Sequence, residues 1–142
     1  HLLQDLWGVK KLPVVSPERI LGKMGTFYQD LTGDKHPGAE TIESNAQLIS
    51  RAKSKGLNLT VDLAEIADLF NKWSTEGDLL LSLWQRLDEW YAAHSLLDFD
   101  DLLNRAVEQI NQLDEWRSLL HEKYRHVLVD EFQDTNPPQW AL

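Results

Sequence analysis

The chain has 142 residues, of which 42% are hydrophobic, and a formal net charge of −9. This length suits one domain of ordinary size, and the charge argues against a free-standing domain that holds DNA or RNA by broad phosphate attraction. The absence of cysteine excludes disulfides and cysteine-based metal sites. Apolar runs are too short for a membrane span and no secretory signal is visible, so we expect a cytoplasmic protein without membrane contact.

The first part of the chain contains one clear helix start. Residues 1–15 are mixed and could end in an extended piece. Ser16 and Pro17 combine an N-cap residue with a proline at the first helical position, which predicts a helix running to about Asp30. Residues 31–39 are rich in glycine, proline and aspartate, and we expect a loop there.

From Glu40 to Tyr124 apolar residues recur at helical spacing, and Gly56 and Gly77 separate successive stripes. The pattern predicts a mainly α fold, and it favours a core role over base stacking for the aromatic residues. The stripes comprise Ile42, Ala46, Leu48, Ile49 and Ala52; Leu63, Ile66, Ala67, Phe70 and Trp73; Leu80, Leu83, Trp84, Leu87, Trp90 and Tyr91; Leu102, Leu103, Ala106, Val107 and Ile110; and Trp116, Leu119, Leu120 and Tyr124.

Three carboxylates, Asp98, Asp100 and Asp101, stand at the start of one of these helices. They have two interpretations, a second metal site or an N-cap with acids in the first helical turn. Orphan amides and the helix dipole favour acids at this position. We favour capping, because it alone explains all three residues.

A group of basic residues, Arg51, Lys53, Lys55 and Lys72, could contact nucleic acid. Charged residues on a helix more often form its solvated face, and we favour that interpretation.

Two apparent motifs fail on spacing. His121 and His126 are five residues apart, so they point to different sides of a helix and do not form a zinc-protease pair. The segment Gly22–Thr26 has two residues between its glycines, whereas a phosphate loop needs four and then Gly-Lys-Ser/Thr. We therefore expect neither zinc nor a phosphate loop in this chain.

The most informative segment is residues 126–136, where an apolar run leads directly into Asp130 and Glu131. A run that is apolar on both faces predicts a central strand of a parallel sheet, over residues 126–130. In nucleoside triphosphatases, acids at such a strand end hold Mg²⁺ and activate the attacking water. Gln133 could sense the γ-phosphate. One strand cannot form a sheet, so we expect its neighbours to lie outside these residues.

Residues 129–136, Val-Asp-Glu-Phe-Gln-Asp-Thr-Asn, resemble helicase motif II of the UvrD/Rep group of superfamily-one DNA helicases. Residues 97–103 resemble the leucine-aspartate-phenylalanine segment that precedes motif II in that group, and the distance between the two segments also fits. Residues 49–56 are similar to a helix of the family's inserted helical subdomain.

The resemblance implies a motor of two RecA-like (P-loop NTPase) α/β domains, each with a helical insertion, that uses ATP and Mg²⁺ to move along single-stranded DNA, typically 3′ to 5′, and to unwind duplex DNA. Residues 1–96 would be mainly the helical insertion of the first motor domain, and residues 97–142 would carry its Walker B strand. Asp130 would be the Mg²⁺ ligand and Glu131 the general base, and Gln133 and Asp134 would couple the nucleotide state to neighbouring motifs.

The family's phosphate-loop motif and the arginine-bearing motifs of its second motor domain do not occur in these residues. Both ends of the chain suggest cuts through a longer protein, and we expect the isolated chain to be inactive. Two alternatives stay open: the motor of a RecB/AddA-type helicase–nuclease, and a helical interaction module in which the acid pair only caps a turn.

Overall fold

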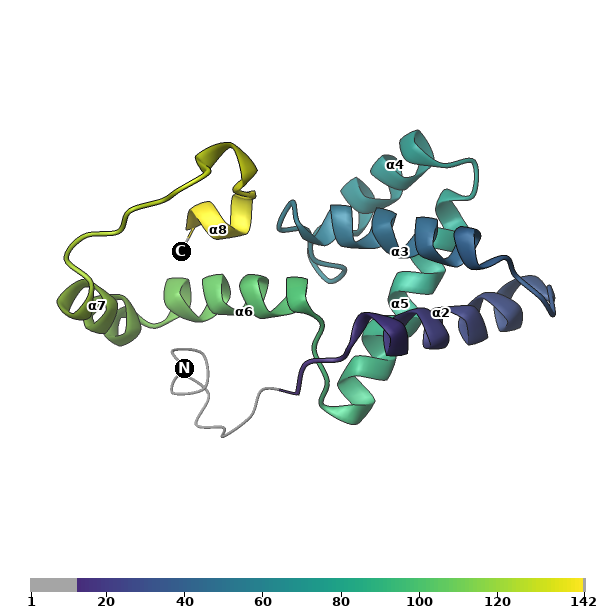
Figure 1. Ribbon diagram of the computed structural model, residues 1–142, viewed down its shortest axis with the longest axis horizontal. Coiled ribbons are helices and arrows are strands. Elements are labelled where there is room, and N and C mark those ends of the chain that lie inside the picture. Colours follow the sequence, from purple (N-terminus) through teal and green to yellow (C-terminus); the bar gives the residue numbers. More distant parts are fainter. Residues whose placement is uncertain (1–12, 142) are drawn as a thin grey trace.

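The computed structural model describes residues 13–141, which are mainly helical (Figure 1). Residues 1–12, including the first half of the predicted extended piece, residues 10–15, lie outside the described part. Four helices form a bundle, and two more helices lead away from it to a 3₁₀ turn and a short final helix. They are α2 (Pro17–Thr32), α3 (Ala39–Lys53), α4 (Leu63–Trp73), α5 (Gly77–His94), α6 (Phe99–Gln112), α7 (Asp114–Lys123), η1 (Phe132–Asp134) and α8 (Pro137–Ala141).

The start and the end of α2 follow from local chemistry. The Ser16 side chain accepts a hydrogen bond from the backbone N–H of Arg19, and Pro17 occupies the first turn. The helix ends at Gly33, whose φ of 75° places it in the left-handed region that glycine adopts without strain. The predicted helix is therefore confirmed, and it ends two residues beyond the predicted Asp30.

The bundle α2–α5 encloses the continuous apolar core. Met24, Ile66, Phe70, Leu80 and Leu83 are completely buried. The aromatic stripe is confirmed as core packing, since the rings of Phe70 and Trp84 lie 6.0 Å apart and the rings of Phe70 and Trp73 6.2 Å apart.

The chain enters and leaves the bundle at neighbouring points. Val14 and Leu97 form an isolated parallel bridge, in which the Val15 N–H donates to the Leu97 carbonyl at 2.8 Å and the Leu97 N–H to the Pro13 carbonyl at 3.0 Å. The end of the predicted extended piece is thus extended where it is described.

Beyond the bundle, α6 continues to α7, and the chain then returns so that α8 packs against α6 (Figure 1). We call α6, α7, the return segment 124–136 and α8 the arm. No helix within residues 13–141 combines the length and the apolar character needed to cross a membrane.

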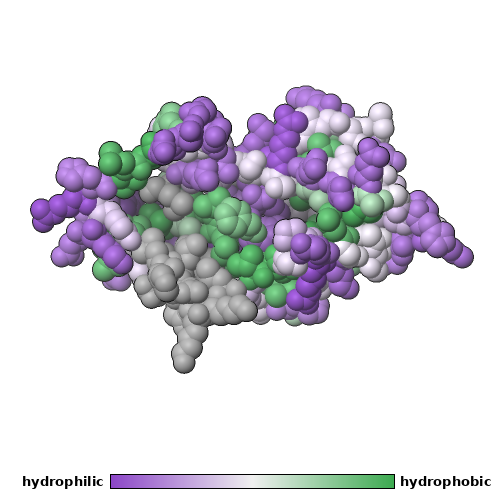
Figure 2. Space-filling view, in the orientation of Figure 1, coloured by the Kyte–Doolittle hydropathy of each residue, from purple (hydrophilic) through white to green (hydrophobic). Residues whose placement is uncertain are grey.

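The predicted strand over residues 126–130 is not formed, so the α/β part of the predicted fold does not appear in residues 13–141. Val127, Leu128 and Val129 are 76%, 96% and 53% exposed, and Figure 2 shows hydrophobic surface along this return segment. The physical reason is that a strand needs a neighbour to pair its backbone N–H and C=O groups. No described segment pairs with residues 126–130. Their apolar sequence alone is not enough to form a strand.

Candidate functional site

Asp130 and Glu131 lie on the surface, at the point where the return segment enters η1. The Glu131 N–H donates to Oδ1 of Asp130 at 2.9 Å. Glu131 has a φ of 51°, an unusual left-handed conformation for a residue with a side chain. Such a kink turns the backbone sharply.

The structure brings the other predicted site residues into the same turn. The Gln133 amide donates to the Glu131 carboxylate, and the Asp134 N–H donates to the Glu131 carbonyl at 2.8 Å. The side chains of Gln133 and Asp134 are exposed. The four residues thus form one short polar loop, and Glu131 is the residue that connects them.

Short-range packing holds this loop on α8. The rings of Phe132 and Trp140 meet edge to face with centroids 4.2 Å apart. Asn136 and Gln139 exchange hydrogen bonds, since the Gln139 N–H donates to the Asn136 side chain at 3.0 Å and the Asn136 N–H to the Gln139 side chain at 2.9 Å. This reciprocal pair is a capping box for α8, a role that we did not predict for Asn136.

The acid pair suits Mg²⁺ in chemistry but does not form a complete site. Carboxylate oxygens are the protein ligands that Mg²⁺ takes, usually one or two of them together with phosphates and waters. Within residues 13–141 no group of three or more potential metal ligands is suitably placed. Three cavities in this part of the chain, of about 430, 360 and 300 Å³, are lined by other residues. The remaining walls of a nucleotide site would have to come from elsewhere.

A second cluster of functional groups lies where α3 meets α6, and Lys53 is at its centre. The prediction of a solvated side chain was wrong for Lys53, which is only 3% exposed. Its Nζ lies 2.6 Å from Oδ2 of Asp98 and 2.8 Å from Oδ1 of Asp101. The ammonium also faces the rings of Tyr91 and Trp84, 5.1 Å and 6.0 Å from their centroids.

The position of Lys53 on α3 explains the error. Lys53 follows Ile42 and Ile49 on the apolar stripe of this helix, so its side chain points inward. A cation on an apolar stripe was the signal that a buried anion should be sought. The anions, however, lie 45 and 48 residues further along the chain.

The capping interpretation of the acids is confirmed. Asp98 accepts from the Asp101 N–H at 2.8 Å, and Asp101 accepts from the Asp98 N–H at 3.2 Å, which completes a capping box. Asp100 accepts a hydrogen bond of 2.6 Å from the Ser50 hydroxyl. The metal alternative finds no support among the described residues.

This cluster contains one cation and three carboxylates, and this imbalance together with burial explains the directions of its pKa shifts. Burial opposes the charge on Lys53, but the attraction of two carboxylates outweighs it, so the pKa of Lys53 is raised. Each carboxylate has one cation and at least one anion nearby. Burial therefore dominates for Asp101, and its pKa is raised although Lys53 counteracts the effect. The pKa of Asp100 is raised for the same first reason, with Ser50 opposing.

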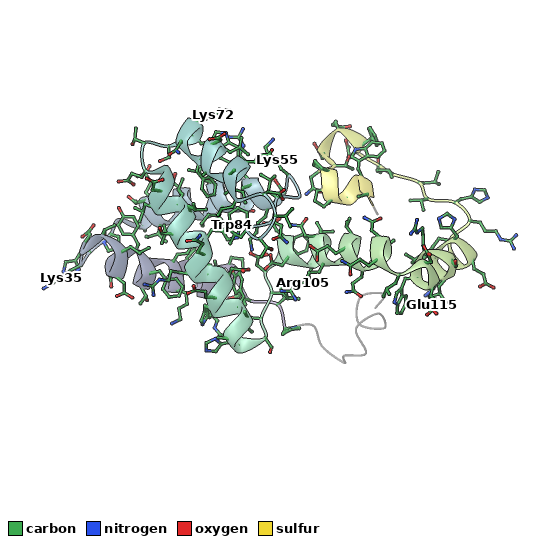
Figure 3. All side chains as sticks on the ribbon, turned by 180° about the vertical axis from the view of Figure 1, so that it is seen from behind. Lys35, Lys55, Lys72, Trp84, Arg105 and Glu115 are labelled. Carbon is green, nitrogen blue, oxygen red and sulfur yellow. The ribbon has the colours of Figure 1, made fainter. Side chains whose placement is uncertain are left out.

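The other basic residues agree with the predicted solvated face. Arg51, Lys55 and Lys72 are exposed, and Figure 3 shows Lys72 at the outer end of the bundle and Lys55 at its edge toward α8. The Arg51 guanidinium lies 4.6 Å from the centroid of the half-buried Trp73 ring.

Comparisons with known proteins support the resemblance to the UvrD/Rep group of helicases. The family model for the UvrD/REP helicase N-terminal domain matches residues 11–142. An ATP-dependent helicase/nuclease subunit from Natranaerobius thermophilus is 31% identical over 137 residues, covering 93% of this chain and 10% of that protein. The ATP-dependent DNA helicase UvrD1 of Mycobacterium leprae is 44% identical over 106 residues, covering 74% of this chain and 14% of that protein.

The ATP-dependent DNA helicase Rep of Salmonella typhimurium is 43% identical over 56 residues, or 37% of this chain and 8% of that protein. No solved structure matches the chain significantly. The chain spans only about a tenth of the length of these relatives. Because the family model covers almost all of its residues, the chain belongs to the UvrD/REP helicase N-terminal domain family.

Proposed function

We propose that this chain is part of the first motor domain of an ATP-dependent DNA helicase. The full-length protein couples ATP hydrolysis to movement on single-stranded DNA, in the 3′ to 5′ direction, and unwinds duplex DNA. The observation that carries the proposal is the string from Val129 to Asn136, which resembles motif II, in a chain whose family match covers residues 11–142.

We assign residues 1–96 mainly to the helical insertion of that domain and residues 97–142 to the RecA-like part. The distribution of apolar contacts supports this boundary. Among the described residues, the continuous core takes side chains from α2 to α5 and from adjoining loops, but none from α6. The chain therefore changes its packing partner close to Leu97.

In this proposal Asp130 holds Mg²⁺ and Glu131 accepts the proton of the attacking water. The metal supplies charge stabilisation at the phosphates when it is bound. Gln133 already donates to the Glu131 carboxylate, so it is placed to orient that base. The Asp134 N–H holds the turn, and the exposed carboxylate of Asp134 is available to neighbouring motifs that respond to the nucleotide.

We further propose that residues 126–130 become the Walker B strand once the rest of the motor pairs with them. Leu128 is 96% exposed, and a run of three neighbouring apolar residues in water favours burial against a partner. The apolar residues on both faces suit a central strand of a parallel sheet.

The test is a Glu131→Gln substitution in the full-length protein. We expect nucleotide binding to stay within a few-fold of the reference and DNA-stimulated ATP hydrolysis to fall by about 10² or more, because the general base is lost. Glu122→Gln is the matched control, since Glu122 is an exposed glutamate on α7, before the return segment. Hydrolysis by Glu131→Gln at the reference rate would show that the acid pair only caps a turn, as in an interaction module without catalysis.

A second candidate is the motor of a RecB/AddA-type helicase–nuclease. It is favoured by the helicase/nuclease protein from Natranaerobius, which aligns with 93% of this chain, more than the UvrD1 protein of Mycobacterium leprae does. Degradation of DNA ends by the purified full-length protein, retained in the Glu131→Gln variant, would identify this candidate. Unwinding without loss of nucleotides would support the simple helicase.

A further inference from the structure

Polar side chains join the last turn of α3 to the first turns of α6. We call this group the polar joint, and it consists of Ser50, Lys53, Asp98, Asp100, Asp101 and Asn104. The ion pairs of Lys53 and the hydrogen bond of Ser50 were described above. In addition, the Asn104 amide donates to the carbonyl of Lys53 at 3.1 Å, so Lys53 is held through both its side chain and its backbone.

The polar joint matters because α6 has no share in the continuous core of the described residues. The hydrophobic effect by itself is non-directional. Hydrogen bonds and ion pairs are restricted in distance and angle. Although α6 also buries Leu102, Ala106 and Ile110 outside that core, its bonds to Lys53 and its neighbours restrict the direction in which it leaves the bundle.

The arm extends this direction to the acid pair. The first turn of α6 is fixed by Asp98 and Asp101, and further along α6 packs against α8. On α8, Trp140 packs against Phe132, which follows Glu131 directly. We call the loop of Asp130, Glu131, Gln133 and Asp134 the acid loop. One series of contacts thus joins the bundle, α6, α8 and the acid loop.

We propose that Lys53 is a positioning residue that sets the angle between the helical bundle and α6, and that it thereby transmits displacements of the bundle to the acid loop. The second half of this inference rests on the proposed helicase function. Lys53 has no contact with the acid loop, and it acts through α6. Without its ammonium, Asp98 and Asp101 face each other as like charges, which opens the polar joint.

The first test measures, in the full-length protein, a distance between α5 and α6 that depends on this angle. Spin labels are placed at Glu89→Cys on α5 and Gln112→Cys on α6, both exposed positions, after replacement of any cysteine that lies outside these residues. Pulsed electron–electron double resonance should give one narrow distance distribution for the reference. We expect the distribution to be at least twofold broader in Lys53→Met and unchanged in Lys55→Met, which removes the same charge two residues away at an exposed position. An unchanged width in Lys53→Met overturns the proposal.

A second variant separates positioning from folding. In Lys53→Met/Asp98→Asn/Asp101→Asn the like charges are removed together with the cation, and asparagine caps helices as well as aspartate does. We expect this variant to keep the helical circular dichroism of the reference and to show the same broadening. A narrow distribution in the triple variant would mean that the charged contacts do not set the angle.

The third readout is the number of base pairs unwound per ATP hydrolysed. A loss of stability alone would lower hydrolysis and unwinding by the same factor. We expect Lys53→Met to lower this ratio at least fivefold while DNA-stimulated hydrolysis stays within twofold. An unchanged ratio refutes transmission through Lys53. If the reference protein shows no DNA-stimulated hydrolysis, the proposed function fails, whereas the distance measurement still decides the positioning role.

Discussion

The bundle α2–α5 and the arm solve the burial of apolar residues in different ways. In the bundle, Leu80 is completely buried because helices from the same chain surround it. In the arm, Leu128 is 96% exposed although it lies in the most apolar run of that region. The difference teaches that the bundle contains its own partners, whereas the return segment has none among the described residues, as its proposed pairing with the rest of the motor requires.

The largest expected effect comes from replacing a leucine with alanine in the bundle, compared with the same replacement in the return segment. Leu80→Ala should lower the free energy of unfolding of this chain by about 2–5 kcal/mol, because it leaves a cavity in a closed core. Leu128→Ala should change it by less than about 0.5 kcal/mol, because the side chain is already in water. Urea unfolding followed by circular dichroism measures both. Equal losses would show that Leu128 is buried in this chain.

The next effect concerns the boundary between the two regions. Lys53→Met should destabilise the chain by about 3 kcal/mol, because removal of one partner leaves two carboxylates, 14% and 17% exposed, without a counter-ion. Lys55→Met, at an exposed position, should stay within about 0.5 kcal/mol of the reference. Equal effects of the two substitutions in the same unfolding experiment would contradict the burial of the Lys53 ammonium.

Alanine substitution of two glycines tests the interior and the C-terminal end of α2. Gly33→Ala should cost about 1 kcal/mol, because alanine is strained at a φ of 75°. Gly25→Ala should instead stabilise by about 0.5–1 kcal/mol, since Gly25 lies inside the helix with open space around it. The two melting temperatures should shift in opposite directions. A shift in the same direction would contradict the helix end at Gly33.

The smallest effect is a pH dependence at the polar joint. The pKa of Asp100 is higher in the folded chain than its usual value of 3.8, mainly because of burial, so the folded state binds this proton more tightly. Its contribution to the free energy of unfolding therefore increases as the pH falls from neutrality toward 3.8. Asp100→Asn removes this contribution. The free energy of unfolding of the reference minus that of this variant should rise as the pH falls from about 6 to about 4. A difference that falls over this range would contradict a raised pKa of Asp100 in the folded chain.

Local signals in the sequence predicted the bundle well. In the bundle, Ser16 begins α2 through a bond within one turn, Pro17 suits its first turn, and the apolar stripes follow from helical spacing. Asp98 begins α6 of the arm through the same kind of bond. The same reasoning failed for Lys53, because its partners are distant in sequence and only the fold brings them to α3.

At the candidate site, prediction from the sequence was limited in the same way, by a partner that lies outside the local segment. The sequence predicted that Asp130, Glu131, Gln133 and Asp134 act together, and the structure places them in one loop. It predicted a strand before them as well, because a run that is apolar on both faces is typical of a central strand of a parallel sheet. Backbone pairing between strands is a property of two segments, and residues 126–130 have no described neighbour.

In the proposed function, the return segment becomes a paired strand only in the full-length protein. Amide hydrogen exchange of residues 127–129 tests it most directly, compared between the isolated 142-residue chain and the full-length protein. We predict exchange close to the rate of an unstructured peptide in the isolated chain, and exchange at least about a hundredfold slower in the full-length protein. Equally fast exchange of these amides in both proteins would contradict the account.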